Sequence, residues 1–401
     1  MGLADDLLGI PVAPEPIHQP PAHPKGWEPG VSWSPDNGGT ITTGPLVAEP
    51  DEAIWQRIIA DWGIDPATTS IIPGSVQIRT WEVVAKGGEI RRLYYYRARL
   101  APRVQGDRLD VDALCEQIMR RKPRRPPATT DGGRALVACL ADWQAGKTDV
   151  DGGTPLLIER VCDAIDALAD RVREQKRNGR PVDAVYLVGM GDLIESCSSS
   201  HATQLFTLDL DLREQIRVVR RLLLRAVDVV GAVAPRVVLT GVPGNHGEAR
   251  TMGKMVTRPS DNHDVGVIEQ VGDILAANPD RYGNVSVTLP EAYTLTLDVA
   301  GVPVSWLHGH GTTPAPKMED WWKGQALGRT GVADSTILVT AHYHHLRISE
   351  ATGRTWLQCP AMDPGSSWWS HRTGQSSPAG MLTFVAGEAC GPRGWADLAV
   401  L

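Results

Sequence analysis

Five short groups of polar residues follow apolar segments along the chain, and their side chains are of the types that bind metal ions. They are Asp142-Trp143-Gln144, Gly191-Asp192, Gly244-Asn245-His246, His308-Gly309-His310 and His342-Tyr343-His344. Carboxylate, amide and imidazole donors of this kind suit Mn²⁺, Fe, Zn²⁺ or Mg²⁺. An Asp after a strand is often only a turn or helix-cap residue. All five groups in one chain nevertheless predict a metal-dependent site.

The segment 241–250, GVPGNHGEAR, shows the pattern most clearly. It follows the apolar run RVVLT, and a plain turn there would need Gly or Asn but no imidazole. The two His-x-His groups place both imidazoles on one face of a strand, because the side-chain period of a strand is two. We therefore expect these residues to do chemistry as well as to turn the chain.

The segments that position these groups predict an α/β fold. Apolar strand-like runs alternate with amphipathic helical segments at 154–175 and 210–230, as in a parallel sheet covered by helices. Ligand sites in such folds lie at the carboxyl ends of the strands. Beyond residue 284 the short runs predict a second, more antiparallel sheet: NVSVTLP, AYTLTLDV, VPVSWLHGHG, STILVTAHYHH, RTWLQCP and GMLTFV.

The first third of the chain predicts separate parts with other roles. Residues 1–50 are rich in Pro and Gly, which indicates an extended arm. Residues 51–104 predict a small α+β accessory module, with a helix over 51–63 and a hairpin from 75–85 and 89–101. The basic, Pro-rich residues 105–133 predict a linker, and 134–401 form the expected catalytic domain.

Composition excludes several classes of protein. A net charge of −7 gives no overall attraction to nucleic acid, so any such contact needs a local basic patch. The N-terminus lacks the features of a signal peptide, and no apolar run is long enough to span a bilayer. We therefore expect a soluble cytoplasmic protein with reduced thiols and no membrane partner. The six scattered cysteines are Cys115, Cys139, Cys162, Cys197, Cys359 and Cys390.

The order of the five groups resembles the calcineurin-like metallophosphoesterase superfamily, whose pattern runs D-x-H, G-D, G-N-H-[D/E], a later H, and G-H-x-H. The resemblance covers roughly residues 134–386 and is closest to phage-type, repair-exonuclease-like members. It implies a four-layer αββα sandwich. Two positions depart from the pattern, since Gln144 stands where the family usually has His and Ala341 where it usually has Gly.

The resemblance also implies a centre of two divalent ions, with Mn²⁺ preferred and Mg²⁺, Fe, Zn²⁺ or Ni²⁺ as alternatives. The first ligand set is Asp142, Gln144, Asp192 and His344. The second ligand set is Asp192, Asn245, His308 and His342.

Within that centre, the resemblance implies catalytic roles for Asp192, Asn245 and His246. A hydroxide bridging the ions would attack the phosphate, and His246 would face the leaving oxygen. Glu248 could orient His246. His308 is preferred over His310 as a ligand, with His310 lining the pocket.

The substrate is less constrained by the sequence. The hairpin mixes arginines with Trp81 and three tyrosines, which suits phosphates and stacked bases, although such aromatics usually pack on their own helix. The leading hypothesis is a phosphodiesterase acting on DNA, a nuclease or exonuclease, and a homo-oligomer is left open. The alternatives are a hydrolase of small nucleotides or phosphomonoesters, and a non-catalytic binding protein. The residues expected to bind substrate are Arg79, Arg97, His201 and His310.

Overall fold

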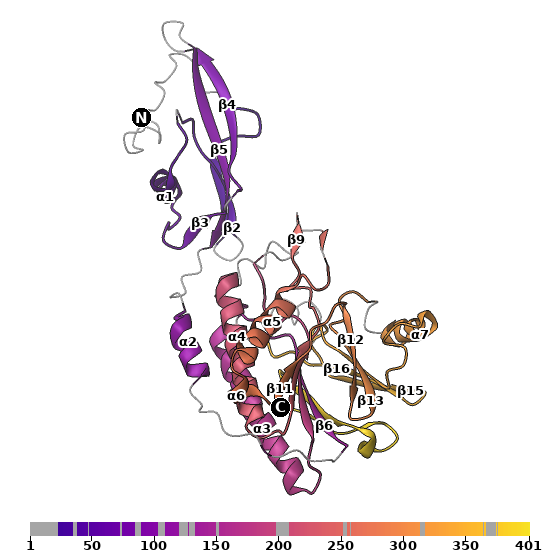
Figure 1. The fold of residues 1–401 in the computed structure, drawn as a ribbon. Helices are drawn as coiled ribbons and strands as arrows, with labels where there is room; N and C mark the ends of the chain where they lie inside the picture. Colours follow the sequence, from indigo (N-terminus) through magenta and orange to yellow (C-terminus); the bar gives the residue numbers. More distant parts are fainter. Residues whose placement is uncertain are drawn as a thin grey trace. The chain divides into compact units, whose positions relative to one another are not determined.

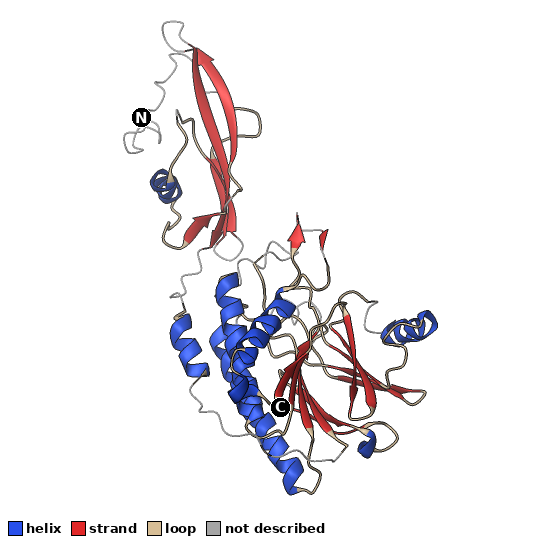
Figure 2. Ribbon diagram, viewed as in Figure 1, coloured by secondary structure: helices blue, strands red, loops and turns tan. Residues whose placement is uncertain are grey.

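The computed structural model describes residues 23–34, 38–46, 48–72, 74–84, 90–102, 109–119, 127, 133–149, 152–197, 208–251, 255–256, 258–312, 317–363, 365, 374 and 376–401. The chain divides into two compact units, residues 1–107 and 108–401. The fold is mixed α/β (Figure 1, Figure 2).

The first unit is an antiparallel sheet with one helix. Its helix, α1, begins after Asp51, whose side chain accepts a hydrogen bond from the backbone N–H of Ile54, as an N-cap residue does. Trp55 and Tyr96 pack edge to face in the core between α1 and the sheet. The elements are β1 (Gly30–Ser34), β2 (Gly38–Thr42), α1 (Glu52–Asp61), β3 (Thr69–Ile71), β4 (Gln77–Val84) and β5 (Ile90–Pro102).

The expected helix and hairpin are both present in this unit, since β4 and β5 pair antiparallel along their length. Part of the expected arm, 1–50, forms strands: β1 and β2 pair with each other, and β2 also pairs with β5. The glycines and prolines suggested an extended arm, but glycine allows close approach of neighbouring backbones, and the pairing partner lies about 60 residues further along.

The second unit contains a six-stranded sheet in the order β11-β8-β7-β6-β17-β18. Strands β11, β8, β7 and β6 run parallel, and β17 and β18 are antiparallel additions. The strands are β6 (Ala135–Leu140), β7 (Ala184–Gly189), β8 (Val237–Gly241), β11 (Val285–Val287), β17 (Leu382–Ala386) and β18 (Trp395–Val400). Between β17 and β18, residues Glu388–Cys390 form a 3₁₀ turn.

Helices cover one face of this sheet, as Figure 2 shows. Helix α4 starts with a capping box, in which Asp211 and Glu214 each accept from the other's backbone N–H. The helices of this unit are α2 (Val111–Ile118), α3 (Thr154–Arg177), α4 (Leu212–Gly231), α5 (His263–Ala276), α6 (Pro279–Tyr282) and α7 (Met318–Gly328). Two short paired strands, β9 (Arg250–Thr251) and β10 (Met255–Val256), precede α5 in the chain.

A second sheet of five strands packs on the other face of the first, in the order β12-β13-β14-β16-β15. Strand β6 shows the arrangement, because Leu136 belongs to the core on the helical side and Val137 to the core between the sheets. This alternation is the strand period of two with both faces buried. The strands are β12 (Thr294–Val299), β13 (Val302–Leu307), β14 (Ile337–Thr340), β15 (Arg347–Ala351) and β16 (Arg354–Gln358).

The outer face of the second sheet is covered by α7, whose Met318 and Trp322 pack with Leu338 and Trp356. Because α7 is the one helix that the described residues place there, the four-layer αββα arrangement stays a prediction.

Two segments lie in a different sheet from the one that the sequence suggested, and one helix forms in the expected linker. The runs at 284–290 and 380–385 were expected in the second sheet, but β11 and β17 join the first sheet, beside β8 and β6. The second sheet is also mixed, since β13, β14 and β16 are parallel. Sheet membership depends on long-range pairing, which local alternation does not encode. Helix α2 forms inside the expected linker and packs against the core of α3 and α4.

Two expectations about class can be compared with the structure. All six cysteines are free thiols. Within the described ranges, every helix is too short or too polar to cross a bilayer.

Candidate metal and catalytic site

The carboxyl ends of strands from both sheets of the second unit meet at one place. Asp142 and Asp192 follow β6 and β7, Asn245 follows β8, and His308 and His342 follow β13 and β14. The predicted ligands from all five sequence groups are therefore brought together by the topology of the two sheets.

The chain turns sharply where it leaves these strands. Of the ten non-glycine residues with positive φ in the described part of the chain, five lie here. A positive φ is uncommon outside glycine, and it costs about 1–3 kcal/mol when the surroundings impose it. The turns direct side chains from neighbouring strand ends to a common point. The five residues are Asp142 (φ 47°), Gln144 (φ 45°), Asp192 (φ 52°), His342 (φ 71°) and His344 (φ 57°).

The second ligand set forms a tight cluster. Ligand atoms of Asp192, His308 and His342 all lie within 4.8 Å of one another. His308 Nε2 is 2.9 Å from Asp192 Oδ2 and 3.1 Å from Asn245 Oδ1. Nitrogen and oxygen donors converging at such distances fit a first-row divalent cation.

The orientation of His308 suits metal binding. Its Nδ1 is 2.8 Å from the carbonyl oxygen of Met190, which can only accept, so Nδ1 carries the proton and Nε2 faces the cluster. Burial lowers the pKa of His308, but the charge of Asp192 and the hydrogen bond to it raise that pKa more, to about 9. The carboxylates thus attract positive charge to this point.

Asp192 is the central carboxylate of the site. Its Oδ1 accepts a hydrogen bond of 2.8 Å from the backbone N–H of His246. Its pKa is lowered, because the charges of His308 and His246 outweigh the opposing effect of burial. Three carboxylates with at most 1% exposure meet here, Asp142, Asp192 and Asp264. Such a group of buried charges is costly unless cations or hydrogen bonds compensate it, so these residues fit a divalent ion.

Asp264, at the start of α5, is a functional residue that the sequence reasoning missed. Its Oδ2 accepts from the backbone N–H groups of Asp192 (2.9 Å) and Gly244 (3.2 Å), and its Oδ1 from that of Leu193 (3.0 Å). Asp264 therefore fixes the ends of β7 and β8 relative to each other. Burial and the charge of Asp192 raise its pKa to about 6.

The first ligand set is arranged differently. His344 Nε2 lies 3.2 Å from Asp142 Oδ1, and the backbone N–H of His342 donates to Asp142 Oδ2. Gln144, however, accepts a hydrogen bond of 2.8 Å from Lys147 through Oε1. Lys147 also pairs with the Asp363 carboxylate. Neither Lys147 nor Asp363 was singled out in the sequence, because no motif marks them.

His246 contacts Glu195. Its Nδ1 is 3.0 Å from the Glu195 carbonyl oxygen and 3.2 Å from Glu195 Oε2. Burial lowers the pKa of His246, but Asp192 and Glu195 raise it further, to about 10. Glu248, which the sequence offered as a residue that could orient His246, contacts His310, with 3.1 Å between Oε1 and Nε2. Glu195, three residues after Asp192, was not singled out in the sequence.

Of the residues expected to bind substrate, one lies beside this cluster, two belong to the first unit, and one cannot be placed. His310 follows β13, and its ring centroid is 5.4 Å from that of His308. Arg79 is exposed on β4 of the first unit. Arg97, on β5, donates to Thr42 Oγ1 and stacks on the Trp27 ring at 4.6 Å, so its guanidinium is engaged within that unit. His201 lies outside the described residues.

Three arginines of α4 make contacts within the second unit. Arg217 pairs with Asp112, and Arg225 pairs with Asp166 at 3.2 Å. Arg220 donates to Gln270 at 2.9 Å.

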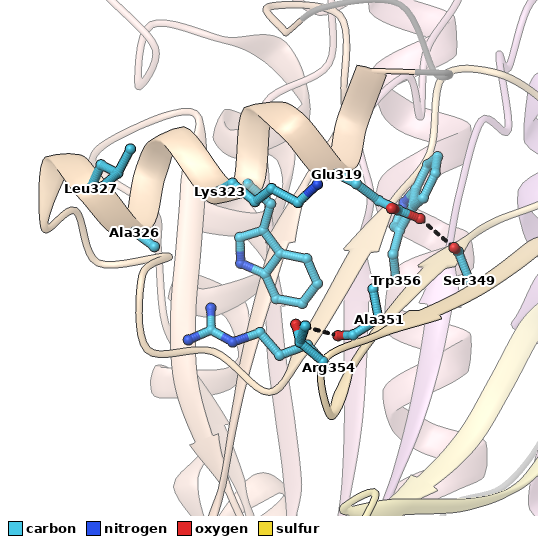
Figure 3. Close-up of a pocket in the computed structure, with 10 residues that line it drawn as sticks. Glu319, Lys323, Ala326, Leu327, Ser349, Ala351, Arg354 and Trp356 are labelled. Carbon is cyan, nitrogen blue, oxygen red and sulfur yellow. Dashed lines mark hydrogen bonds between the residues drawn. The ribbon is translucent and has the colours of Figure 1, made fainter.

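A separate pocket lies between α7 and strands β15 and β16 (Figure 3). Its volume is about 530 Å³, and its walls include Trp322, Trp356 and Arg354. Glu319 hydrogen-bonds Ser349 across its edge. None of the ten lining residues belongs to either ligand set, so this pocket is distinct from the metal cluster.

No protein-family model and no curated protein matches the sequence. Among solved structures, the chain is similar to a "predicted phosphoesterase" from Streptococcus pneumoniae TIGR4, with 10% identity over 63% of this chain and 83% of that chain, TM-score 0.25. It is similar to an archaeal phosphodiesterase, with 10% identity over 66% and 99%, TM-score 0.30. A third is Vps29 complexed with zinc from Entamoeba histolytica, with 12% identity over 66% and 97%, TM-score 0.25.

Proposed function

We propose that the chain is a divalent-metal-dependent phosphoesterase of the calcineurin-like type. The observation that carries this proposal is the cluster of Asp192, His308 and His342, whose ligand atoms lie within 4.8 Å of one another. Asn245 and His246, from the neighbouring strand end, reach the same cluster. A largely buried Asp/Asn/His donor set beside the hydrogen-bonded imidazole of His246 suits hydrolysis of a phosphate ester.

Each residue has a distinct task in this proposal. A divalent ion held by Asp192, Asn245, His308 and His342 would neutralise phosphate oxygens and supply an activated water. The Asn245 amide is placed to contact a phosphate oxygen. His246, whose Nδ1 contacts Glu195, presents Nε2 to the site and would donate a proton to the leaving oxygen.

The substrate class that we propose is a phosphodiester, with DNA as the first candidate, as for the phage-type exonuclease-like members of the superfamily. Support comes from the exposed Arg79, two residues before the partly exposed Trp81 on β4, and from the exposed Arg99 on β5. A small nucleotide or phosphomonoester is the second candidate. The internal pairing of Arg97, Arg217 and Arg225 favours it, because these guanidinium groups already have partners.

The test is hydrolysis by full-length protein that has been stripped with a chelator and resupplied with Mn²⁺. Linear and circular DNA, bis(p-nitrophenyl) phosphate and p-nitrophenyl phosphate would be compared in the same buffer. We expect cleavage of the diester substrates that needs added metal, and preference for linear DNA would indicate that an end is required.

Asp192→Asn is the test variant and Asp170→Asn its matched control, because Asp170 lies on the exposed side of α3. Loss of hydrolysis in the first variant alone would support the proposal. Intact diesters with cleaved monoester would favour the second candidate. A protein that binds no metal and cleaves none of the four substrates would instead be a binding protein on this fold.

A further inference from the structure

The first ligand set contains a positive charge that belongs to the protein. Lys147 Nζ lies 2.8 Å from Gln144 Oε1. An ammonium group can only donate, so the atom facing it must be the amide oxygen of Gln144. That oxygen is the one atom with which Gln144 could bind a metal ion, and the positive charge of Lys147 lies beside it, where it would repel a second cation.

A second contact holds Lys147 in place. Its ammonium pairs with the Asp363 carboxylate, and the two side chains are only 13% and 5% exposed. Asp363 is itself fixed, because its backbone N–H donates to the Asp142 carbonyl and its own carbonyl accepts from Arg160. The other Asp363 oxygen lies 3.7 Å from His344 Nδ1. Lys147 is therefore a buried part of the site.

The amide nitrogen of Gln144 points toward His246, with 3.4 Å between the two Nε2 atoms. Both nitrogens carry protons when His246 is an imidazolium, so this contact is not a hydrogen bond in the state in which His246 donates to a leaving oxygen. The end of Gln144 that a neighbour engages is therefore its amide oxygen, which Lys147 contacts.

The second ligand set differs in kind. The partners of Asp192 are the imidazoles of His308 and His246 and the backbone N–H of His246, and His308 also contacts the Asn245 amide oxygen and the Met190 carbonyl oxygen. An imidazole can exchange its proton for a metal ion, whereas an ammonium group has no lone pair with which to bind one. Within the described residues, the His and carboxylate side chains whose ligand atoms are close enough to share a metal ion belong to this set. They are Asp192, His308 and His342. A cation at the second set would stabilise the buried carboxylate charge, whereas at the first set it would be repelled by the Lys147 ammonium.

We propose that the chain binds one divalent ion, at Asp192, Asn245, His308 and His342, and that the ammonium of Lys147 replaces the ion of the first ligand set. This inference rests on the proposed function and refines it. The site then combines a single metal with a fixed protein cation, and both can face the phosphate oxygens. The Gln144 departure and Lys147 are parts of the same replacement.

The experiment measures metal stoichiometry on the full-length chain. Chelator-stripped protein would be titrated with Mn²⁺ by calorimetry, the bound metal counted by mass spectrometry after gel filtration, and the Mn²⁺ signal recorded by electron paramagnetic resonance. We expect one ion per wild-type chain and the spectrum of isolated Mn²⁺. Two ions of similar affinity, with the spectrum of a coupled pair, would overturn the inference while leaving the proposed function intact. No bound ion would overturn both.

Three variants make the test specific to Lys147. Lys147→Met removes the charge and leaves Asp363 without its cation, so we expect a second ion to bind, at least about tenfold more tightly than any second ion on the wild type. Lys147→Arg keeps the charge and should bind one ion. Lys176→Met, on the exposed end of α3, should also bind one. If Lys147→Met folds with a wild-type circular dichroism spectrum and still binds one ion, the inference fails. If it does not fold, the wild-type stoichiometry decides.

Discussion

At the scale of single residues, the carboxylate of Glu195 contacts the His246 imidazole and stabilises its positive charge. We predict that Glu195→Gln lowers kcat for a diester by at least about tenfold, a part of the roughly 10²–10⁴-fold that a positioned acid or base contributes. The neutral amide no longer stabilises the imidazolium 3.2 Å away. Steady-state kinetics at saturating Mn²⁺ would separate kcat from KM.

Glu248→Gln is the control for this prediction. It makes the same chemical change on a carboxylate that contacts His310, so we expect it to change KM more than kcat. Equal losses of kcat in the two variants would show that general loss of negative charge, and not the contact with His246, causes the effect.

Asp264 shows how a residue outside both ligand sets can govern them. Asp264→Asn would turn an N–H donor toward backbone N–H groups of Asp192, Gly244 or Leu193. We predict a loss of about 1–3 kcal/mol in the free energy of unfolding, the cost of an unsatisfied buried donor. We also predict about 10–100-fold weaker Mn²⁺ binding, as for residues that orient metal ligands.

Urea unfolding and calorimetric titration with Mn²⁺ would measure the two effects of Asp264→Asn. Asp273→Asn, on the exposed face of the same helix, removes the same charge and should change neither quantity appreciably. If Asp264→Asn is destabilised but binds Mn²⁺ like the wild type, Asp264 is structural only.

At the scale of elements, close packing between strand ends sets the geometry of the site. A methyl group added at Gly244 would lie 2.1 Å from the backbone nitrogen of Asp192 and 2.3 Å from its Oδ1. We predict that Gly244→Ala lowers the free energy of unfolding by about 1–3 kcal/mol, the usual cost of overpacking, and displaces the Asp192 carboxylate. Urea unfolding and Mn²⁺ affinity are the measurements.

Gly266, in α5, provides the matched control for Gly244. A methyl group added there meets nothing within 4 Å, so Gly266→Ala should be neutral or stabilising by about 0.5–1 kcal/mol. Equal destabilisation by both substitutions would argue against the steric explanation.

Elements and motif residues were more predictable from the sequence than their partners. Periodicity located α1, α3 and α4 closely, and the strand-end position of Asp192 followed from the apolar run before it. The pairing of β11 with β8 and of β17 with β6 could not be predicted from the sequence, because register between distant strands has no local signature.

The same reason explains the site residues that were missed. Asp264 lies 72 residues from Asp192, and Asp363 lies 216 residues from Lys147. Each matters through a contact that only the folded chain creates. Gln144 departs from the pattern of the family that the sequence resembles, but its contact with Lys147 is visible only in the folded chain.

At the scale of the whole molecule, the two units have separate hydrophobic cores. Within the described residues, the clusters around Trp55 and Tyr95 contain only residues of 1–107, and those around Leu136, Val137 and Leu338 contain only residues of 108–401. Units that bury their own apolar surface are expected to fold independently. The metal cluster lies wholly in the second unit.

We therefore predict that the fragment 108–401 folds and binds Mn²⁺ with the stoichiometry and affinity of the full chain. Calorimetric melting of the full chain should show two transitions, and only the transition of the second unit should shift upward with Mn²⁺, because a ligand stabilises the unit that binds it. A single transition, or a fragment 108–401 that cannot bind Mn²⁺, would show that the units depend on each other.

A second prediction applies if DNA is the substrate and the exposed arginines of the hairpin bind it. The fragment should then hydrolyse bis(p-nitrophenyl) phosphate like the full chain. Its KM for DNA should be at least about tenfold higher, with a weaker salt dependence, because fewer phosphate contacts remain. An unchanged KM for DNA would place substrate binding in the second unit alone and leave the first unit another role.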